Sequence, residues 1–244
     1  MTSPDGCEQA RAGANPAAAE FDAYSTSYDG LVENSVAFSG LKRDFFVAAK
    51  IALLAELFAE HIDDRPLSLL DVGCGVGLMH SRLRGIVASL AGTDVSRRAI
   101  ARAAQEHPEV EYRAFVGAAL PWESHVFDVS LAVCVFHHVA RRERAALMRE
   151  MHRVARPGGL VVIIEHNPWN PLTRLAVARC PFDADAELLD ARAGRLLMMM
   201  AAAFAQVHSR HFLMMPSAAG WSRRIEKRAR SLPIGAQYAL VGEV

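Results

Sequence analysis

Residues 69–77 (LLDVGCGVG) have the composition of a nucleotide-binding loop. An apolar stretch leads into glycines at alternate positions, Gly73, Gly75 and Gly77. Glycine permits a tight turn at the carboxyl edge of a parallel sheet and lets a ligand approach the backbone. An ordinary turn between a strand and a helix also uses glycines, so the neighbouring acids must decide between the two interpretations.

Two aspartates favour ligand binding and indicate the kind of ligand. Asp94 ends the next apolar stretch after Asp71, and an acid at that place accepts hydrogen bonds from ribose hydroxyls. A dinucleotide fingerprint would need a third glycine at position 78, where Leu78 stands. The Asp71 carboxylate would repel a pyrophosphate and attract an ammonium group. S-adenosylmethionine has a ribose, an ammonium group and no phosphate, so it fits this loop better than NAD does.

Polar side chains also follow two later apolar stretches, 127–136 and 160–164. Open α/β sheets bind ligands beyond the ends of such strands. Of His137 and His138, we expect one to act on a methyl acceptor and the other to pack beneath the next helix. His166 is a candidate base near neutral pH, because the neighbouring Glu165 favours its charged form while burial opposes it. The segment after this strand is dense in polar and aromatic residues that we expect to contact substrate: Glu165, Asn167 and Trp169.

No metal site is predicted from the sequence. His208 and His211 lie three positions apart on an expected strand and therefore point to opposite faces. The cysteines form no C-x-x-C pair and are expected to be free thiols: Cys7, Cys74, Cys134 and Cys180.

Alternating strand and helix patterns must position these residues. Apolar stretches predict strands at 67–72, 87–94, 110–116, 127–136 and 160–164. Helical patterns lie at 78–86, 96–106, 141–155 and, as one long helix, within 172–205. Two closing strands, 207–214 and 237–241, enclose a helix at 217–230. Such alternation predicts parallel βαβ units with helices on both faces of the sheet.

The first part of the chain has a different pattern. Residues 1–16 lack periodicity and are expected to form a disordered arm. Residues 17–66 are expected to form an N-terminal helical lid that ends at Pro66, and residues 67–244 the main domain. Tyr24 and Tyr28 share a helix face, so they either close over the ligand and contact the substrate or pack between the helices of the lid.

Four motifs in order resemble the class I methyltransferases of the methyltransferase-11 type: LLDVGCGVG, GTDVS, LPWESHVFDVSLAVCVFHHV and REMHRVARPGGLVVIIEH. Ubiquinone and menaquinone C-methyltransferases and many natural-product methyltransferases belong to that group. The motifs cover residues 67–166, and the closing LPIGAQYALVGEV resembles the family's last strand. The resemblance implies a Rossmann-like, seven-stranded, mostly parallel α/β sheet with an antiparallel last strand and an N-terminal helical lid.

The resemblance also implies a set of cofactor contacts. The loop residues that would wrap the methionine part of S-adenosylmethionine are Asp71, Gly73, Cys74, Gly75 and Gly77. Asp94 would bind the ribose, Val95 would pack on the adenine, and Cys134 would lie at the end of the fourth strand beside the cofactor. The third motif departs from the family, which often has an acid where residues 116–121 read VGAALP. Backbone groups would serve the adenine there instead, at Gly117, Ala118 and Ala119.

Composition excludes several classes of protein. Among the 244 residues, 27 lysines and arginines balance 27 acids, which gives no basic surplus for nucleic-acid phosphates. A hydrophobic fraction of 52% argues against a disordered chain. The longest apolar run, 196–205, is about half of what a membrane span needs, and no signal sequence is visible. We expect a cytoplasmic monomer or homodimer.

The expected function is methyl transfer from S-adenosylmethionine to an oxygen, nitrogen or activated carbon atom of a small-molecule acceptor from biosynthetic or secondary metabolism. A lipid-linked or saccharide-linked acceptor is the alternative. An NAD-dependent oxidoreductase is disfavoured by the glycine spacing. A non-catalytic cofactor-binding protein would not need the polar group at 165–169.

Overall fold

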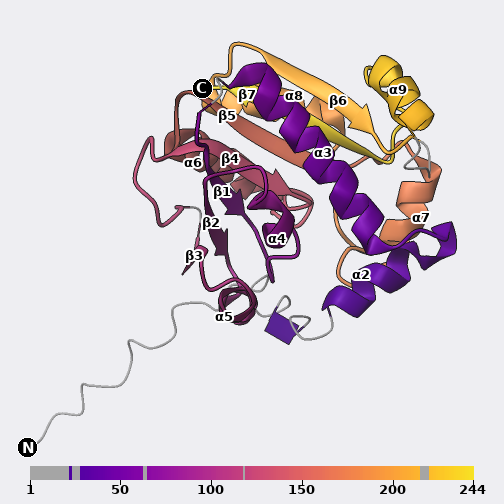
Figure 1. Cartoon of the computed structure of the whole chain (residues 1–244), viewed down its shortest axis with the longest axis horizontal. Helices are drawn as coiled ribbons and strands as arrows, with labels where there is room; N and C mark the ends of the chain where they lie inside the picture. The colour runs from indigo at the N-terminus through magenta and orange to yellow at the C-terminus, as the bar shows by residue number, and fades with distance from the viewer. Residues whose placement is uncertain (1–21, 24–27, 63–64, 118, 215–219) are drawn as a thin grey trace, which may run out of the picture.

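The computed structural model describes residues 22–23, 28–62, 65–117, 119–214 and 220–244. The expected arm at 1–16, together with Tyr24 and Ala118, therefore lies outside the described residues. A central sheet holds the described chain together (Figure 1). Its strands are β1 (Ser68–Val72), β2 (Ser89–Asp94), β3 (Glu111–Ala114), β4 (Phe127–Val133), β5 (Ala155–His166), β6 (Val207–Phe212) and β7 (Gln237–Glu243).

The seven strands have the order β3-β2-β1-β4-β5-β7-β6. The pairs from β3 to β5 are parallel, whereas β7 runs antiparallel to both β5 and β6. The last strand therefore enters between two strands made earlier in the chain. This arrangement confirms the predicted mostly parallel sheet with an antiparallel last strand.

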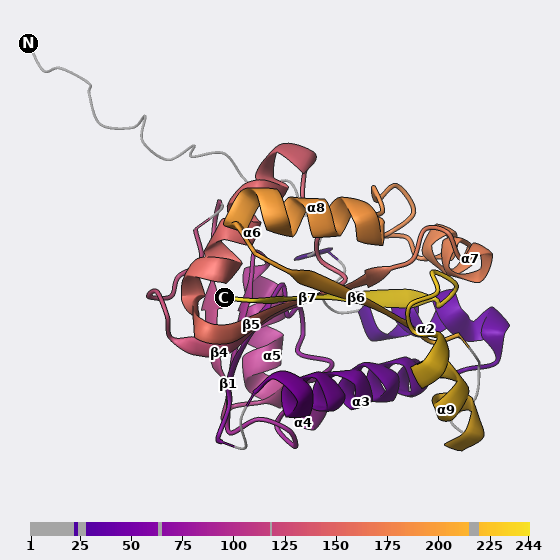
Figure 2. The same cartoon turned by 90° about the horizontal axis from the view of Figure 1, so that it is seen from above.

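Helices cover both faces of the sheet (Figure 2). On one side lie α6 (Arg141–Val154) and α8 (Ala191–Ala202), and on the other lie α3 (Arg43–His61), α4 (His80–Leu83) and α5 (Arg97–Glu106). The remaining helices are α2 (Tyr28–Val36), the short 3-10 helix η1 (Ala37–Ser39), α7 (Pro171–Arg179) and α9 (Gly220–Ala229). None of the helices within these described ranges is long and apolar enough to cross a bilayer.

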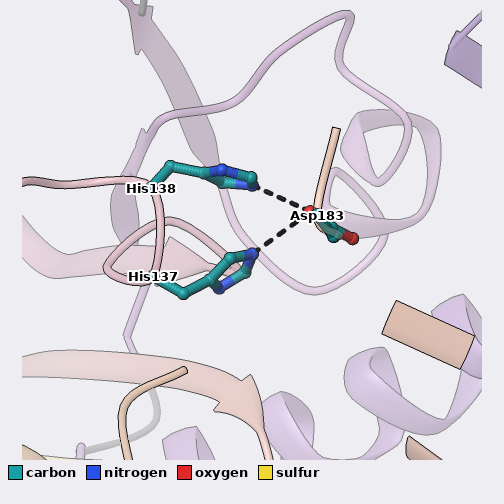
Figure 3. Close-up of side chains that lie close together, drawn as sticks. All are labelled: His137, His138 and Asp183. Carbon is teal, nitrogen blue, oxygen red and sulfur yellow. Dashed lines mark hydrogen bonds and ion pairs between the residues drawn. The ribbon is translucent and has the colours of Figure 1, made fainter. Parts of the chain in front are cut away.

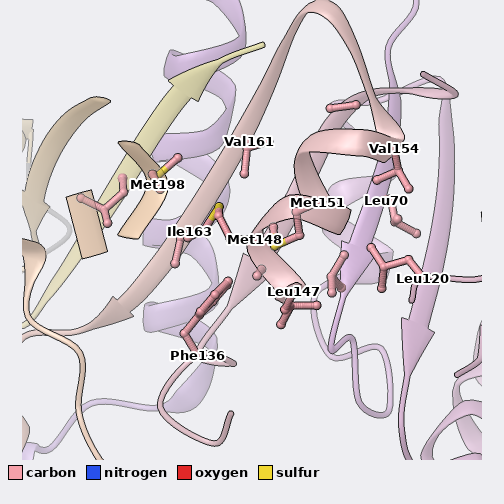
Figure 4. Packing of buried hydrophobic residues seen from close by; sticks show 14 of the residues in the cluster. Leu70, Leu120, Phe136, Leu147, Met148, Met151, Val154, Val161, Ile163 and Met198 are labelled. Atoms are coloured by element: carbon pink, nitrogen blue, oxygen red, sulfur yellow. The ribbon is translucent and has the colours of Figure 1, made fainter. Parts of the chain in front are cut away.

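Strand β5 shows why the sheet is covered on both faces. Its run 160–164 (LVVII) is fully buried, as expected for a central parallel strand. Val161 and Ile163 pack with Met148 and Met198 from α6 and α8, as Figure 4 shows. The alternate residues 160, 162 and 164 pack on the opposite face, with α3. Polar residues at either set of alternate positions on β5 would remove the apolar surface on which one layer of helices packs.

The helix expected within 172–205 is two helices, which corrects the prediction. The Asn170 side chain accepts hydrogen bonds from the backbone of Leu172 and Thr173 and so begins α7. Asp190 caps α8 in the same way. The chain between them, 180–190, contains Pro181, which lacks the backbone donor that a continuous helix would need.

The N-terminal helices divide between two roles. Helix α3 belongs to the core, because Leu54, Leu57 and Phe58 are buried on the sheet. Gly40 follows η1 with φ of 71°, which turns the chain between α2 and α3. Helix α2 lies beside α7 at the carboxyl end of the sheet (Figure 1). The lid therefore stays a prediction for α2, while α3 is a layer of the main fold.

Candidate functional site

A cavity of about 290 Å³ opens at the carboxyl end of the sheet, where open α/β sheets bind ligands. Its wall is formed by α2, the first half of α3, the glycine loop, the end of β4, α7 and the chain next to β7. Most of the wall is apolar, with side chains such as Phe45, Met79 and Val177. Its charged or ionisable side chains are Arg43, Lys50, Asp71, His138, His166 and Asp183, besides the cysteines.

The glycine loop needs its glycines for two different reasons. Gly73, Gly75 and Gly77 all adopt positive φ, at 73°, 55° and 77°. A Cβ atom on Gly73 would lie 2.5 Å from Val135, so the loop packs closely against the end of β4. A Cβ atom on Gly75 would meet nothing within 4 Å. The backbone is therefore open to a ligand at Gly75, which lines the cavity.

Asp71 lies on the cavity wall and is fixed by the buried side chain of His80, which also contacts the half-buried Tyr112. Its Oδ2 lies 3.0 Å from Nε2 of His80, and Nδ1 of His80 lies 2.5 Å from the hydroxyl of Tyr112. The sequence predicted Asp71 but not these two partners. They are separated from it by 9 and 41 positions, and only the packing of α4 against β3 brings them together.

Asp94 is buried and supports the glycine loop directly. Its Oδ2 accepts from the backbone N–H of Gly75 at 2.9 Å, and its Oδ1 from that of Ser96 at 2.8 Å. Burial raises the pKa of Asp94, and this effect is larger than the lowering by the two hydrogen bonds. Asp94 and Val95 lie behind the loop, outside the cavity wall, and Gly117 and Ala119 are exposed. The structure thus brings Asp71, Gly73, Cys74, Gly75 and Cys134 together on the wall, without Gly77 or the residues expected at the ribose and adenine.

His137 and His138 both contact Asp183, a residue that the sequence analysis missed (Figure 3). Nε2 of His137 lies 3.4 Å and Nε2 of His138 lies 3.0 Å from Oδ1 of Asp183. On its other side, Nδ1 of His137 lies 2.6 Å from Oε2 of Glu165. Burial opposes a charge on His137, but Glu165 and Asp183 raise its pKa well above the ordinary value. Burial likewise opposes a charge on Asp183, yet the hydrogen bonds from the two histidines lower its pKa.

His166 lines the cavity, but it does not form the expected pair with Glu165. Glu165 pairs with His137 rather than with His166. Burial and the neighbouring His137 lower the pKa of His166 to about 4. The expectation of a base that titrates near neutral pH is therefore wrong, and His166 is a neutral imidazole at pH 7.

The residues expected to contact substrate lie away from the cavity wall. Glu165 is fully buried, and its Oε1 accepts from the backbone N–H groups of Val135 and Phe136. Asn167 is also buried and donates to the carbonyl groups of Pro233 and Gly235. These two side chains form hydrogen bonds within the protein and do not line the cavity.

Three other residues were expected to contact the substrate: Trp169, Tyr24 and Tyr28. The Trp169 side chain is 75% exposed and does not line the cavity. Tyr24 lies outside the described residues, and of Tyr28 only the backbone position in α2 is described. Their predicted contacts with the substrate stay predictions.

Cys134 ends β4 in a strained conformation. Its φ of 57° is left-handed, a region that non-glycine residues adopt rarely. Its thiol accepts from Nε2 of Gln237 at 3.6 Å, and burial raises its pKa to about 11. Cys134 is therefore a neutral, inert wall residue. Like Cys74 and Cys180 it forms no disulfide, as predicted for these three described cysteines.

Comparison with known proteins agrees with this geometry. A family model described as a methyltransferase domain matches residues 70–163. The chain is 32% identical over 144 residues to a ubiquinone biosynthesis O-methyltransferase of Sinorhizobium medicae, covering 54% of this chain and 57% of that protein. It is 35% identical over 108 residues to the protein of the same name from Ruegeria pomeroyi, covering 42% and 43%. The chain thus spans about half the length of the relatives that it matches.

Solved structures show the same fold at lower identity. A methyltransferase of Thermotoga maritima superposes with a TM-score of 0.61 at 19% identity, over 91% of this chain and 97% of that one. A methyltransferase of Mesorhizobium loti has a TM-score of 0.55 at 21% identity, over 78% and 96%. The glycine loop, the strand order and the family model over residues 70–163 agree with a class I methyltransferase domain, the fold that the resemblance of the motifs implies.

Proposed function

We propose that this protein transfers a methyl group from S-adenosylmethionine to a small-molecule acceptor, in class EC 2.1.1. The observation that supports this best is Asp71, a carboxylate on the cavity wall next to the open backbone of Gly75. A carboxylate there attracts the ammonium group of a bound amino acid and repels a pyrophosphate. With Asp94 behind the same loop, the residues present fit S-adenosylmethionine and not a dinucleotide.

S-adenosylmethionine supplies a methyl group that is already activated by its positive sulfur. In the displacement, the bond from the acceptor atom to the methyl carbon forms as the carbon–sulfur bond breaks, and the electron pair stays on sulfur. The protein has to align the acceptor with that carbon, and alignment alone contributes on the order of 7–11 kcal/mol. Asp71 and the glycine loop would hold the amino-acid end. His166, neutral on the cavity wall, would take the proton that the acceptor loses.

The cavity wall and the relatives support a narrower acceptor class. Most of the wall surface is apolar, and phenylalanine, leucine, valine and methionine side chains contribute to it, which suits an apolar or aromatic body. The relatives named as ubiquinone biosynthesis O-methyltransferases support oxygen as the methylated atom. We therefore propose a hydroxyl group on a small aromatic molecule as the acceptor.

Calorimetry with S-adenosylmethionine, its demethylated product and NAD tests the cofactor assignment. The first two should bind, and NAD should not. Asp94→Ala should weaken binding of S-adenosylmethionine by roughly 10-fold to 100-fold, because it removes the carboxylate that holds the glycine loop at Gly75, and hydrogen bonds to a charged group contribute about 1.5–3 kcal/mol. Asp185→Asn is a matched control, because Asp185 is exposed and away from the cavity.

Two outcomes would overturn parts of this assignment. Near-wild-type affinity in Asp94→Ala, at an unchanged melting temperature, would remove Asp94 from the cofactor site. Binding of NAD in preference to S-adenosylmethionine would replace methyl transfer by hydride transfer as the proposed reaction.

A further inference from the structure

A group of two histidines and one aspartate lies at the cavity, apart from the residues assigned to the cofactor. His137 and His138 follow β4, and Asp183 lies between α7 and α8 (Figure 3). One ring nitrogen of each histidine and one carboxylate oxygen of Asp183 lie within 4.8 Å of one another. Nothing in the proposed methyl transfer requires these three atoms to converge.

The spacing of the three atoms suits a common metal ion. Metal–nitrogen and metal–oxygen bonds to zinc are about 2.0–2.2 Å in tetrahedral sites, which puts neighbouring ligand atoms about 3.3 Å apart. The two distances to Oδ1 of Asp183 are 3.4 Å from His137 and 3.0 Å from His138. A hydrogen bond from a charged nitrogen to a carboxylate is shorter, at about 2.7–2.9 Å. The distance of 3.4 Å between Nε2 of His137 and Oδ1 of Asp183 is longer than a charged hydrogen bond. It is close to the separation expected between two ligand atoms of one zinc ion.

Glu165 orients His137 as ligating histidines are usually oriented. Its Oε2 accepts a hydrogen bond from Nδ1 of His137 at 2.6 Å, and its Oε1 is fixed by two backbone N–H groups. Metal-binding histidines almost always donate their second ring N–H to such a carboxylate or carbonyl. The arrangement turns Nε2 of His137 toward Asp183.

Buried charge supports a cation at this place. Glu165 is fully buried and Asp183 is 7% exposed. Buried carboxylates require compensation by a positive charge. A divalent ion between the histidines and Asp183 would compensate both. Because His138 and Asp183 line the cavity, the remaining coordination position would face it.

We propose that His137, His138 and Asp183 bind a divalent transition-metal ion, Zn²⁺ first among them, with one coordination position open to the cavity. Two imidazoles and one carboxylate suit zinc or ferrous iron and not Mg²⁺ or Ca²⁺, which prefer oxygen ligands. This replaces the expectation of no metal site. An ion here would bind the hydroxyl group of the acceptor and lower its pKa. That role rests on the proposed function, but the binding of the ion itself does not.

Metal binding is measured on the full chain without an affinity tag, after removal of bound metal with a chelator. Plasma mass spectrometry after dialysis against Zn²⁺ should give one ion per chain, and Co²⁺ in its place should give the strong visible absorption of a four-coordinate site. Asp183→Asn and His138→Gln should each weaken Zn²⁺ binding by at least about tenfold. Asp185→Asn, two residues from Asp183 and exposed, should bind as the wild type does.

The competing arrangement is a protonated His137 held between two carboxylates without a metal. It predicts no stoichiometric Zn²⁺ in the wild type, or equal binding in all four proteins, and either result overturns the metal site. So does binding of Mg²⁺ at least as tight as that of Zn²⁺. If Asp183→Asn fails to fold, His138→Gln decides, since that side chain is 17% exposed at the cavity. Zinc binding without S-adenosylmethionine binding would uphold this site and reject the proposed function.

Discussion

Glu165 shows how neighbours in the sequence can differ in role. Glu165 and His166 are adjacent on β5, so their side chains point to opposite sides of the strand. The pair expected from adjacency, Glu165 with His166, is therefore geometrically disfavoured. Glu165 instead reaches across to His137, 28 positions earlier. Strand alternation by itself disfavours the pair of neighbours, but it does not predict the contact with His137.

His166→Ala is the substitution that tests the acceptor side of the cavity. If His166 accepts the acceptor proton, the variant should lower kcat by about 10²-fold, the smaller end of what a general base contributes, with unchanged affinity for S-adenosylmethionine. Release of the demethylated cofactor, measured with a panel of hydroxyaromatic acceptors, gives these constants. His208→Ala, an exposed histidine on β6, is the control.

A rise in KM alone would assign His166 to acceptor positioning. Unchanged kcat and KM for every acceptor that turns over would mean that the proton is taken elsewhere.

At the scale of elements, one aspartate ties together the amino ends of three strands. Asp128 on β4 accepts from the backbone and hydroxyl of Ser68 on β1, both at 2.7 Å. It also pairs with Arg65 and with Arg156 on β5. Burial alone would raise the pKa of Asp128, but the backbone of Ser68 and the Arg65 guanidinium lower it below its ordinary value of 3.8. Nothing in the local sequence pattern predicts this junction.

Asp128→Asn should destabilise the fold at neutral pH by roughly 1.5–3 kcal/mol, the range for hydrogen bonds to a charged group. A lowered pKa in the folded state contributes stability that is complete above pH 3.8 and is lost as pH falls through the lower folded pKa. Chemical unfolding at pH 7 and below pH 4 should therefore show a difference between wild type and variant that shrinks in acid. Asp44→Asn is the control, because Asp44 forms an exposed ion pair with Arg82.

If the free energies of unfolding of wild type and variant differed by the same amount at both pH values, the charge of Asp128 would not contribute to stability.

The segment between α7 and α8 explains why Asp183 was missed. The pattern over 172–205 predicted one helix, which would have placed residue 183 on a helix surface. The caps at Asn170 and Asp190 divide it, and the irregular chain between them brings Asp183 to the end of β4. Helical periodicity carries no information about where an irregular segment leads, so neither Asp183 nor the cluster with His137 could be predicted.

At the scale of the whole molecule, the sequence predicted the layers well. Alternation of apolar stretches and helical patterns predicted a parallel sheet covered on both faces, and the fully buried run at 160–164 lies on an interior strand of it, β5. The place of the last strand was implied by the family resemblance and not by pattern. The walls of the cavity could not be predicted, because they combine α2, α3 and α7 with residues 213–214 and 236–237, segments that only the tertiary fold brings together.

The place of β7 between β5 and β6 sets the order in which the sheet can be completed during synthesis on the ribosome. Among the described strands, β6 is bonded only to β7, so residues 207–212 have no partner until residues 237–243 have emerged. A released chain truncated after residue 236 should be cleaved within 207–212 by a protease, while β1 to β5 resist. Ala236 and Gln237 also line the cavity. The ligand site would therefore be complete only after residues 236–237 have left the ribosome, too late for a bound ligand to guide the formation of β1 to β5.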